Sequence, residues 1–252
     1  MGSLDVSLQS AINGLKHAKP WLNVTLGSLA GFEIGPWCVR NVLLFPNMTT
    51  SATMSVREQL AACPVGTFIW SRELAGVSTA VEMALSRIVA EEHSPIVRVR
   101  KGLYWRTTWT RFGPTRPTER QIAIEIAGPG SGPAGVAAAH DLGLTTQVPS
   151  VDYIAVPGRP PRPIRGVRFL SRQYHRRELG LRPLEVAILE ALRAGPGVVE
   201  VDWSELVQRI RVLVEAGHLR VDVLSEAAAK EFDLDVRTKF SALEQELVHA
   251  TT

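Results

Sequence analysis

A helical apolar stripe followed directly by a basic, alternating segment is the feature that most constrains this sequence. Apolar side chains recur at helical spacing up to Pro95, at Val77, Val81, Leu85, Ile88 and Val89. Residues 96–100 then alternate apolar and basic side chains, as in a strand with one exposed face. Lys101-Gly102 supplies a turn, and residues 103–106 form the second strand of the hairpin. The pattern predicts an amphipathic helix over Ser78–Glu91, with Thr79 and Glu82 as its capping box, followed by a β-hairpin with a basic exposed side.

Shorter elements precede this helix and hairpin. Residues 55–62 predict a short helix, residues 68–70 a short strand, and residues 72–75 another short helix that Gly76 ends. Three helices and a basic hairpin, in this order, are the plan of a winged helix-turn-helix. We therefore expect a winged-helix domain over residues 54–108, preceded by an N-terminal extension (residues 1–53) whose structure the sequence does not indicate.

The remainder of the chain mixes helix and strand signals. Residues 109–117 are polar, contain proline and are typical of a linker. Two strands are expected at residues 153–157 and 167–170, joined by a hairpin loop, and helices are expected at 119–127 (capped by Thr118), 134–142, 183–194, 203–216, 224–232 and 236–249. The predicted class is α+β, with the winged helix followed by an α/β C-terminal domain over residues 118–252.

Charge is distributed unevenly along the chain. Residues 96–177 contain fourteen basic and four acidic side chains, whereas residues 178–252 contain eight basic and fourteen acidic ones. A basic block of this size indicates contact with a polyanion, and arginine suits phosphate and guanine. The arginines within Arg159–Arg177 leave two interpretations open: further contact with a nucleic-acid backbone, or pairing with the acidic C-terminal third.

The predicted helix and hairpin together suit duplex DNA. A helix fits the major groove and presents its polar face to base edges, while a basic wing follows the phosphates. The residues expected to contact DNA are Ser78, Thr79, Glu82, Met83, Ser86 and Arg87 on the helix, and Arg98, Arg100, Lys101 and Arg106 on the hairpin. Glu82 either reads a cytosine amine or only caps the helix. The alternative function for this domain is protein contact, with the basic hairpin solvated.

The other motifs give weaker signals. Residues 130–135 match G-x-G-x-x-G, but a helix is expected before them and Pro133 lacks a backbone N–H, so a structural loop is favoured. A nucleotide-binding enzyme using Gly130–Gly135 remains the alternative class. The histidines His93, His140, His175 and His218 are scattered, and Cys38 and Cys63 lack metal-ligand spacing. We expect no catalysis, cofactor or metal, and a cytoplasmic protein without a membrane partner.

Three segments resemble the AbiEi family of antitoxins from type IV toxin–antitoxin systems. They are Ser86–Val89 with Val97–Tyr104, Ala137–Pro149, and Arg182–Leu192, and the resemblance covers about residues 55–240. It implies a winged-helix transcription regulator that binds double-stranded DNA repeats in the promoter of its own operon and represses it. It also implies that the C-terminal domain counteracts a nucleotidyltransferase-like toxin without a stable complex. An arginine often follows the helix glutamate in that family, whereas Val186 follows Glu185 here.

Overall fold

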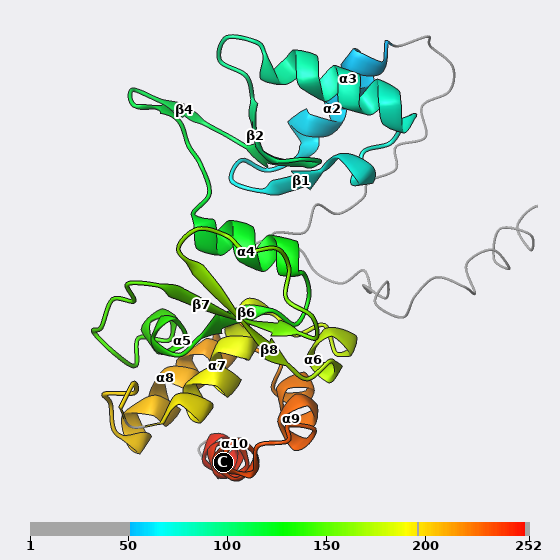
Figure 1. Cartoon of the computed structure of the whole chain (residues 1–252). Coiled ribbons are helices and arrows are strands. Elements are labelled where there is room, and N and C mark those ends of the chain that lie inside the picture. Colours follow the sequence, from blue (N-terminus) through cyan, green and yellow to red (C-terminus); the bar gives the residue numbers. More distant parts are fainter. Residues whose placement is uncertain (1–50, 196, 250–252) are drawn as a thin grey trace, which may run out of the picture. The chain divides into compact units, whose positions relative to one another are not determined.

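The structure is a computed structural model that describes residues 51–195 and 197–249, so nearly all of the expected N-terminal extension lies outside the described residues. Helices and strands alternate irregularly along the chain, and the fold is of the expected α+β class (Figure 1). The three-stranded sheets have the orders β1-β3-β2 and β6-β7-β8.

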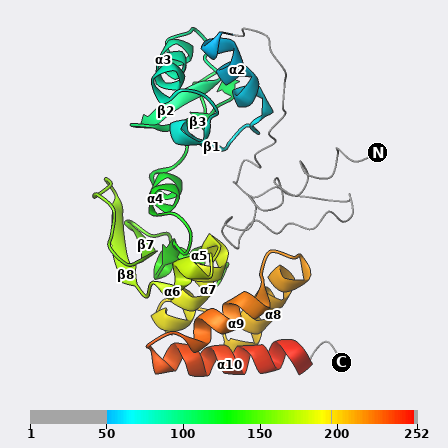
Figure 2. The ribbon, with the colours of Figure 1, turned by 90° about the vertical axis from the view of Figure 1, so that its right-hand side faces the viewer.

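The first sheet lies beside two helices. Along the chain come α2 (Ala52–Ala62), β1 (Phe68–Trp70), a 3-10 turn (Ser71–Glu73), α3 (Ser78–Val89), β2 (Ile96–Arg100) and β3 (Leu103–Arg106). All pairs in the sheet are antiparallel. Both helices pack on one face of it (Figure 2), because their apolar stripes meet in one buried cluster that contains Val56, Leu60, Ile69, Val81, Leu85, Ile88, Ile96 and Tyr104.

Helix α3 begins differently from the prediction. Its N-cap is Val77, which offers no side-chain hydrogen bond. A capping box requires its hydroxyl at the N-cap, but Thr79 is the second residue of the helix, so the expected box with Glu82 is wrong. The helix also ends at Val89 rather than Glu91. Glu82 is therefore free of a capping role.

The opposite face of the first sheet is also covered. Phe68, Leu103 and Trp105 join a second buried cluster with apolar residues from the C-terminal half, including Ile122 and Ile154. The segment interpreted as a linker forms a small hairpin, β4 (Trp109–Thr110) with β5 (Gly113–Pro114).

The second sheet corrects one prediction. After α4 (Glu119–Ala127), with its predicted Thr118 cap, come β6 (Gly132–Ala134), α5 (Val136–Asp141), β7 (Asp152–Pro157) and β8 (Val167–Arg172). Strands β7 and β8 are parallel, with Asp152 opposite Val167, so the expected hairpin loop between them is wrong. The connection crosses back along the sheet instead, and the buried run 154–156 suits a parallel strand covered on both faces.

Helices complete the C-terminal half. They are α6 (His175–Glu178), α7 (Pro183–Ala194), α8 (Trp203–Glu215), α9 (Val221–Ala229) and α10 (Leu234–His249). Helix α7 is the central one: it packs on β6 and α5, while α10 lies against α7, α8 and α9 (Figure 2). Its residues 185–192 are all buried, including two glutamates.

Candidate nucleic-acid interface

The polar face of α3 is open to solvent. The side chains that point inward from this helix are Val81, Ala84, Leu85 and Ile88. The six helix residues expected to contact DNA are all exposed: Ser78, Thr79, Glu82, Met83, Ser86 and Arg87. This exposure follows from the apolar stripe, because burying one side of a helix leaves the other side in water.

A β-bulge divides the basic residues of the β2–β3 hairpin between two faces. Arg98 is paired with Tyr104, but Arg100 is paired with Leu103, so Val99 is an extra residue in β2. Residues paired across a sheet share a face. Arg98 therefore lies on the α3 side with Tyr104, while Arg100 lies on the other side with Leu103. The expectation that both arginines share one exposed side is wrong.

Arg106 lies at the base of the hairpin and is half-buried. Its Nη1 donates a hydrogen bond to the carbonyl oxygen of Pro95 at 2.9 Å, and its Nε is enclosed without a partner. The reason is register: Arg106 is opposite Ile96, a core residue. Its expected place on the exposed side of the hairpin is therefore wrong, and it links the two strands at their base.

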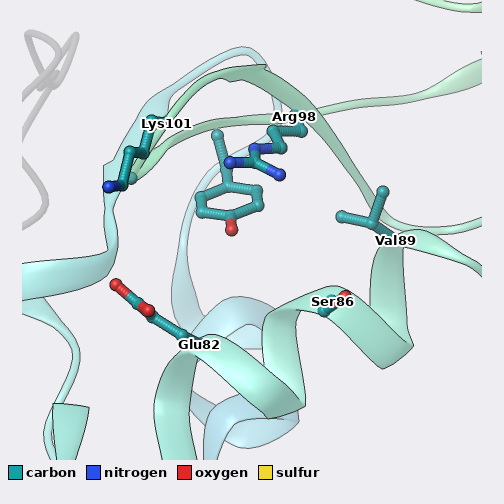
Figure 3. A pocket seen from close by; sticks show the side chains of 7 residues that line it. Glu82, Ser86, Val89, Arg98 and Lys101 are labelled. Carbon is teal, nitrogen blue, oxygen red and sulfur yellow. The ribbon is translucent and has the colours of Figure 1, made fainter. Parts of the chain in front are cut away.

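A notch of about 180 Å³ separates α3 from the hairpin. Glu82, Ser86 and Val89 line it from the helix, and Arg98, Lys101, Gly102 and Tyr104 line it from the hairpin. Figure 3 shows Arg98 and Lys101 across the notch from Glu82 and Ser86. Val89 and Tyr104 were not among the expected contacts, because their sequence pattern indicates only core positions.

The charges around the notch are largely uncompensated. In the part of the chain that the structure describes, the side chains of Glu82, Arg87, Arg98 and Lys101 form no hydrogen bond or ion pair. Glu91, near the end of α3, pairs instead with Arg57 of α2. Among the residues that line the notch, the two cations Arg98 and Lys101 thus outnumber the one carboxylate, that of Glu82, which favours a polyanion.

The second arginine run divides into two groups. Arg172, Arg176 and Arg177 bind protein acceptors, with Arg172 bidentate on Glu190 at 2.7–2.8 Å and Arg177 on the carbonyl oxygen of Ala127 at 2.9 Å. The other four arginines are exposed: Arg159, Arg162, Arg165 and Arg168. Pairing with the acidic C-terminal third therefore accounts for part of the run.

Arg176 is the centre of a buried ion cluster. Its side chain is 0% exposed and donates to Glu190 at 2.8 Å and to Glu231 at 2.7 Å. Glu231 also accepts from Arg193 at 2.5 Å. Burial raises the pKa of Glu190, but hydrogen bonds and charges from Arg172 and Arg176 outweigh it and leave that pKa below its ordinary value. These ion pairs connect α6, α7 and the turn after α9.

The glycine-rich loop is used for close packing. A Cβ on Gly130 would lie 2.6 Å from the backbone of Arg176 and Arg177, and one on Gly132 would lie 2.6 Å from the carbonyl oxygen of Pro183. The N–H of Gly130 already donates to Leu181 at 3.0 Å. Both glycines are explained by the approach of neighbouring backbone, and α4 precedes the loop where a dinucleotide fold has a strand.

Residues 51–195 and 197–249 contain no group of His, Cys, Asp and Glu side chains arranged to hold a metal ion. Over the same residues, every helix is too short or too polar to span a bilayer.

Comparisons with known proteins do not identify the chain. No protein-family model and no curated protein matches it. Among solved structures, it is similar to the crystal structure of the RV2827C protein from Mycobacterium tuberculosis, with 16% identity and a TM-score of 0.38 over 80% of this chain and 78% of that one. A likeness at this level supports no argument about fold or function.

Proposed function

We propose that this protein binds duplex DNA through a winged helix formed by α2, β1, the Ser71–Glu73 turn, α3, β2 and β3. The order of these elements and the β1-β3-β2 sheet support the proposal. The observation that carries it is the pairing of an exposed polar helix face with a cationic hairpin across one notch. In this proposal α3 enters the major groove and the hairpin contacts phosphates.

The resemblance to AbiEi antitoxins extends the proposal. The protein is then a regulator that represses its own operon. It also counteracts a nucleotidyltransferase-like toxin encoded beside it, without forming a stable complex with that toxin. The C-terminal core around α7 contains no residue of the DNA-binding elements, which supports a second role of this kind.

DNA binding is tested by gel shift with full-length protein and the DNA upstream of its own coding sequence. Three cations contact phosphate or base edges in this proposal: Arg87, Arg98 and Lys101. If each neutralises one phosphate, log K falls against log salt with a slope of about −2.7. Replacing both Arg98 and Lys101 with alanine is expected to weaken binding to every duplex and to bring the slope to about −0.9.

Replacing Arg87 tests whether binding depends on the base sequence of the DNA. R87A is expected to lower preference for the upstream DNA over unrelated duplex, because a helix side chain that reaches base edges carries specificity. Arg237 on α10 is exposed in the same way but lies far along the chain, so R237A is the matched control. Binding that is equal for wild type, R87A and the hairpin double variant would reject the proposal, as would no shift of any duplex at low salt.

The antitoxin role has its own experiment. Co-expression with the neighbouring nucleotidyltransferase-like gene is expected to restore growth that the toxin alone arrests. A variant lacking Arg98 and Lys101 should still restore growth, since these residues serve DNA. Continued arrest with wild-type protein would reject the antitoxin role and leave DNA binding standing.

A further inference from the structure

The floor of the notch contains a tyrosine whose hydroxyl has no protein partner. Tyr104 is 5% exposed, because its ring packs in the cluster beneath α2 and α3. It nevertheless lines the notch, and its hydroxyl forms no hydrogen bond within the described residues. Buried tyrosines ordinarily give their hydroxyl a partner. This one is held rigidly by its ring, with the polar end facing the notch.

Three further donors surround it. Arg98 and Lys101 stand on the hairpin wall and Ser86 on the helix wall, and none of their side-chain donors binds another described residue (Figure 3). Two cations and two hydroxyls around one small space match the oxygens of a single phosphate group, which accepts several hydrogen bonds and carries negative charge.

We propose that the notch is the seat of one backbone phosphate of duplex DNA, with the Tyr104 hydroxyl as a neutral donor at its floor. This inference rests on the proposed DNA binding. A sugar-phosphate strand separates the major groove from the minor groove, so a strand must pass between a helix in one and a hairpin over the other. The notch lies between those two elements.

Glu82 has the opposite effect at the same place. Its carboxylate is exposed on the helix wall, across from Arg98 and Lys101, and it carries a charge of the same sign as phosphate. It therefore weakens contact with any phosphate in the notch, whatever the base sequence. Removing the charge should tighten binding to all duplexes, which makes Glu82 a residue that limits non-specific affinity.

The test is a titration of full-length protein with a mixed-sequence duplex of about three helical turns, at several salt concentrations. Y104F keeps the ring and loses only the hydroxyl. It should bind roughly tenfold more weakly, the effect of losing one hydrogen bond to a charged group. The salt slope should stay unchanged, because a neutral hydroxyl releases no counterion, whereas R98A should make it shallower by about 0.9. E82Q should bind more tightly than wild type.

Y174F is the matched control, since Tyr174 is exposed and lies outside the notch; its affinity should equal that of wild type. Wild-type binding with unchanged affinity in Y104F would overturn the phosphate seat and leave the proposed function intact. No wild-type binding to any duplex would overturn both. If the Y104F circular-dichroism melt shows loss of folding, S86A on the helix surface decides: weaker binding at constant slope supports the seat, and unchanged binding overturns it.

Discussion

Replacing Glu231 with glutamine should destabilise the protein more than any comparable surface change. The Glu231 side chain is 0% exposed and accepts hydrogen bonds from Arg176 at 2.7 Å and from Arg193 at 2.5 Å. Arg176 is itself 0% exposed, and one of its terminal nitrogens, Nη2, has no partner. Glutamine fills the same volume but removes the negative charge, so Arg176 keeps only Glu190 as a counterion.

The magnitude follows from that burial. Removing one member of a buried ion pair costs about 3–5 kcal/mol, because the remaining charge stays desolvated. For a chain of this length, each kcal/mol lowers the melting temperature by about 2–4 °C, so E231Q should melt roughly 6–20 °C below wild type. Circular dichroism at 222 nm with full-length protein measures the shift.

Glu226 supplies the control on the same helix–turn segment. It pairs with Lys230 at 2.7 Å, but both side chains are about half exposed, so E226Q should cost no more than about 0.5 kcal/mol. Equal melting temperatures for E231Q and E226Q would refute the reasoning, because they would mean that Arg176 does not depend on its buried counterions.

Three further outcomes are expected. First, stability should decline as the pH falls. The pKa of Glu190 is depressed from 4.5, so its stabilisation is present above pH 4.5 and is lost as the pH falls through the folded-state value. Burial lowers the pKa of His175 from 6.5, so a second loss of stability begins below pH 6.5; urea unfolding at several pH values checks both. Second, the pKa of Glu200 should be about 2 by NMR titration, because the backbone N–H of Thr146 and the side chain of Gln147 donate to it; an ordinary value would contradict these bonds. Third, G132A should cost about 1–3 kcal/mol because its Cβ meets the carbonyl oxygen of Pro183 at 2.6 Å, whereas G197A, with open space around its Cβ, should cost little; equal urea midpoints would contradict the close packing.

Local sequence signals predicted the elements that depend on local contacts. The helix at Pro183–Ala194 was predicted at both ends, and α3 and the β2–β3 hairpin were predicted within two residues. In these cases the apolar period, a proline or a Gly-containing turn lies inside the element itself.

Features set by partners distant in sequence were not predictable in the same way. The parallel pairing of β7 with β8 depends on how the chain returns after Pro157, and the burial of Arg176 depends on carboxylates 14 and 55 residues away. In the candidate interface, the exposed face of α3 followed from periodicity. The depth of Tyr104 and the half-burial of Arg106 did not, because both depend on strand register.

The extra residue at Val99 shows how little sequence change is needed to redirect a charge. Inserting one uncharged residue before Leu103 would pair Val99 with Leu103, and simple alternation would then place Arg100 on the same face as Arg98. The net charge and the count of basic residues in the hairpin would stay the same. Two relatives that differ by this single codon would thus look equally basic in an alignment, yet offer a nucleic acid different numbers of cations on the side facing α3.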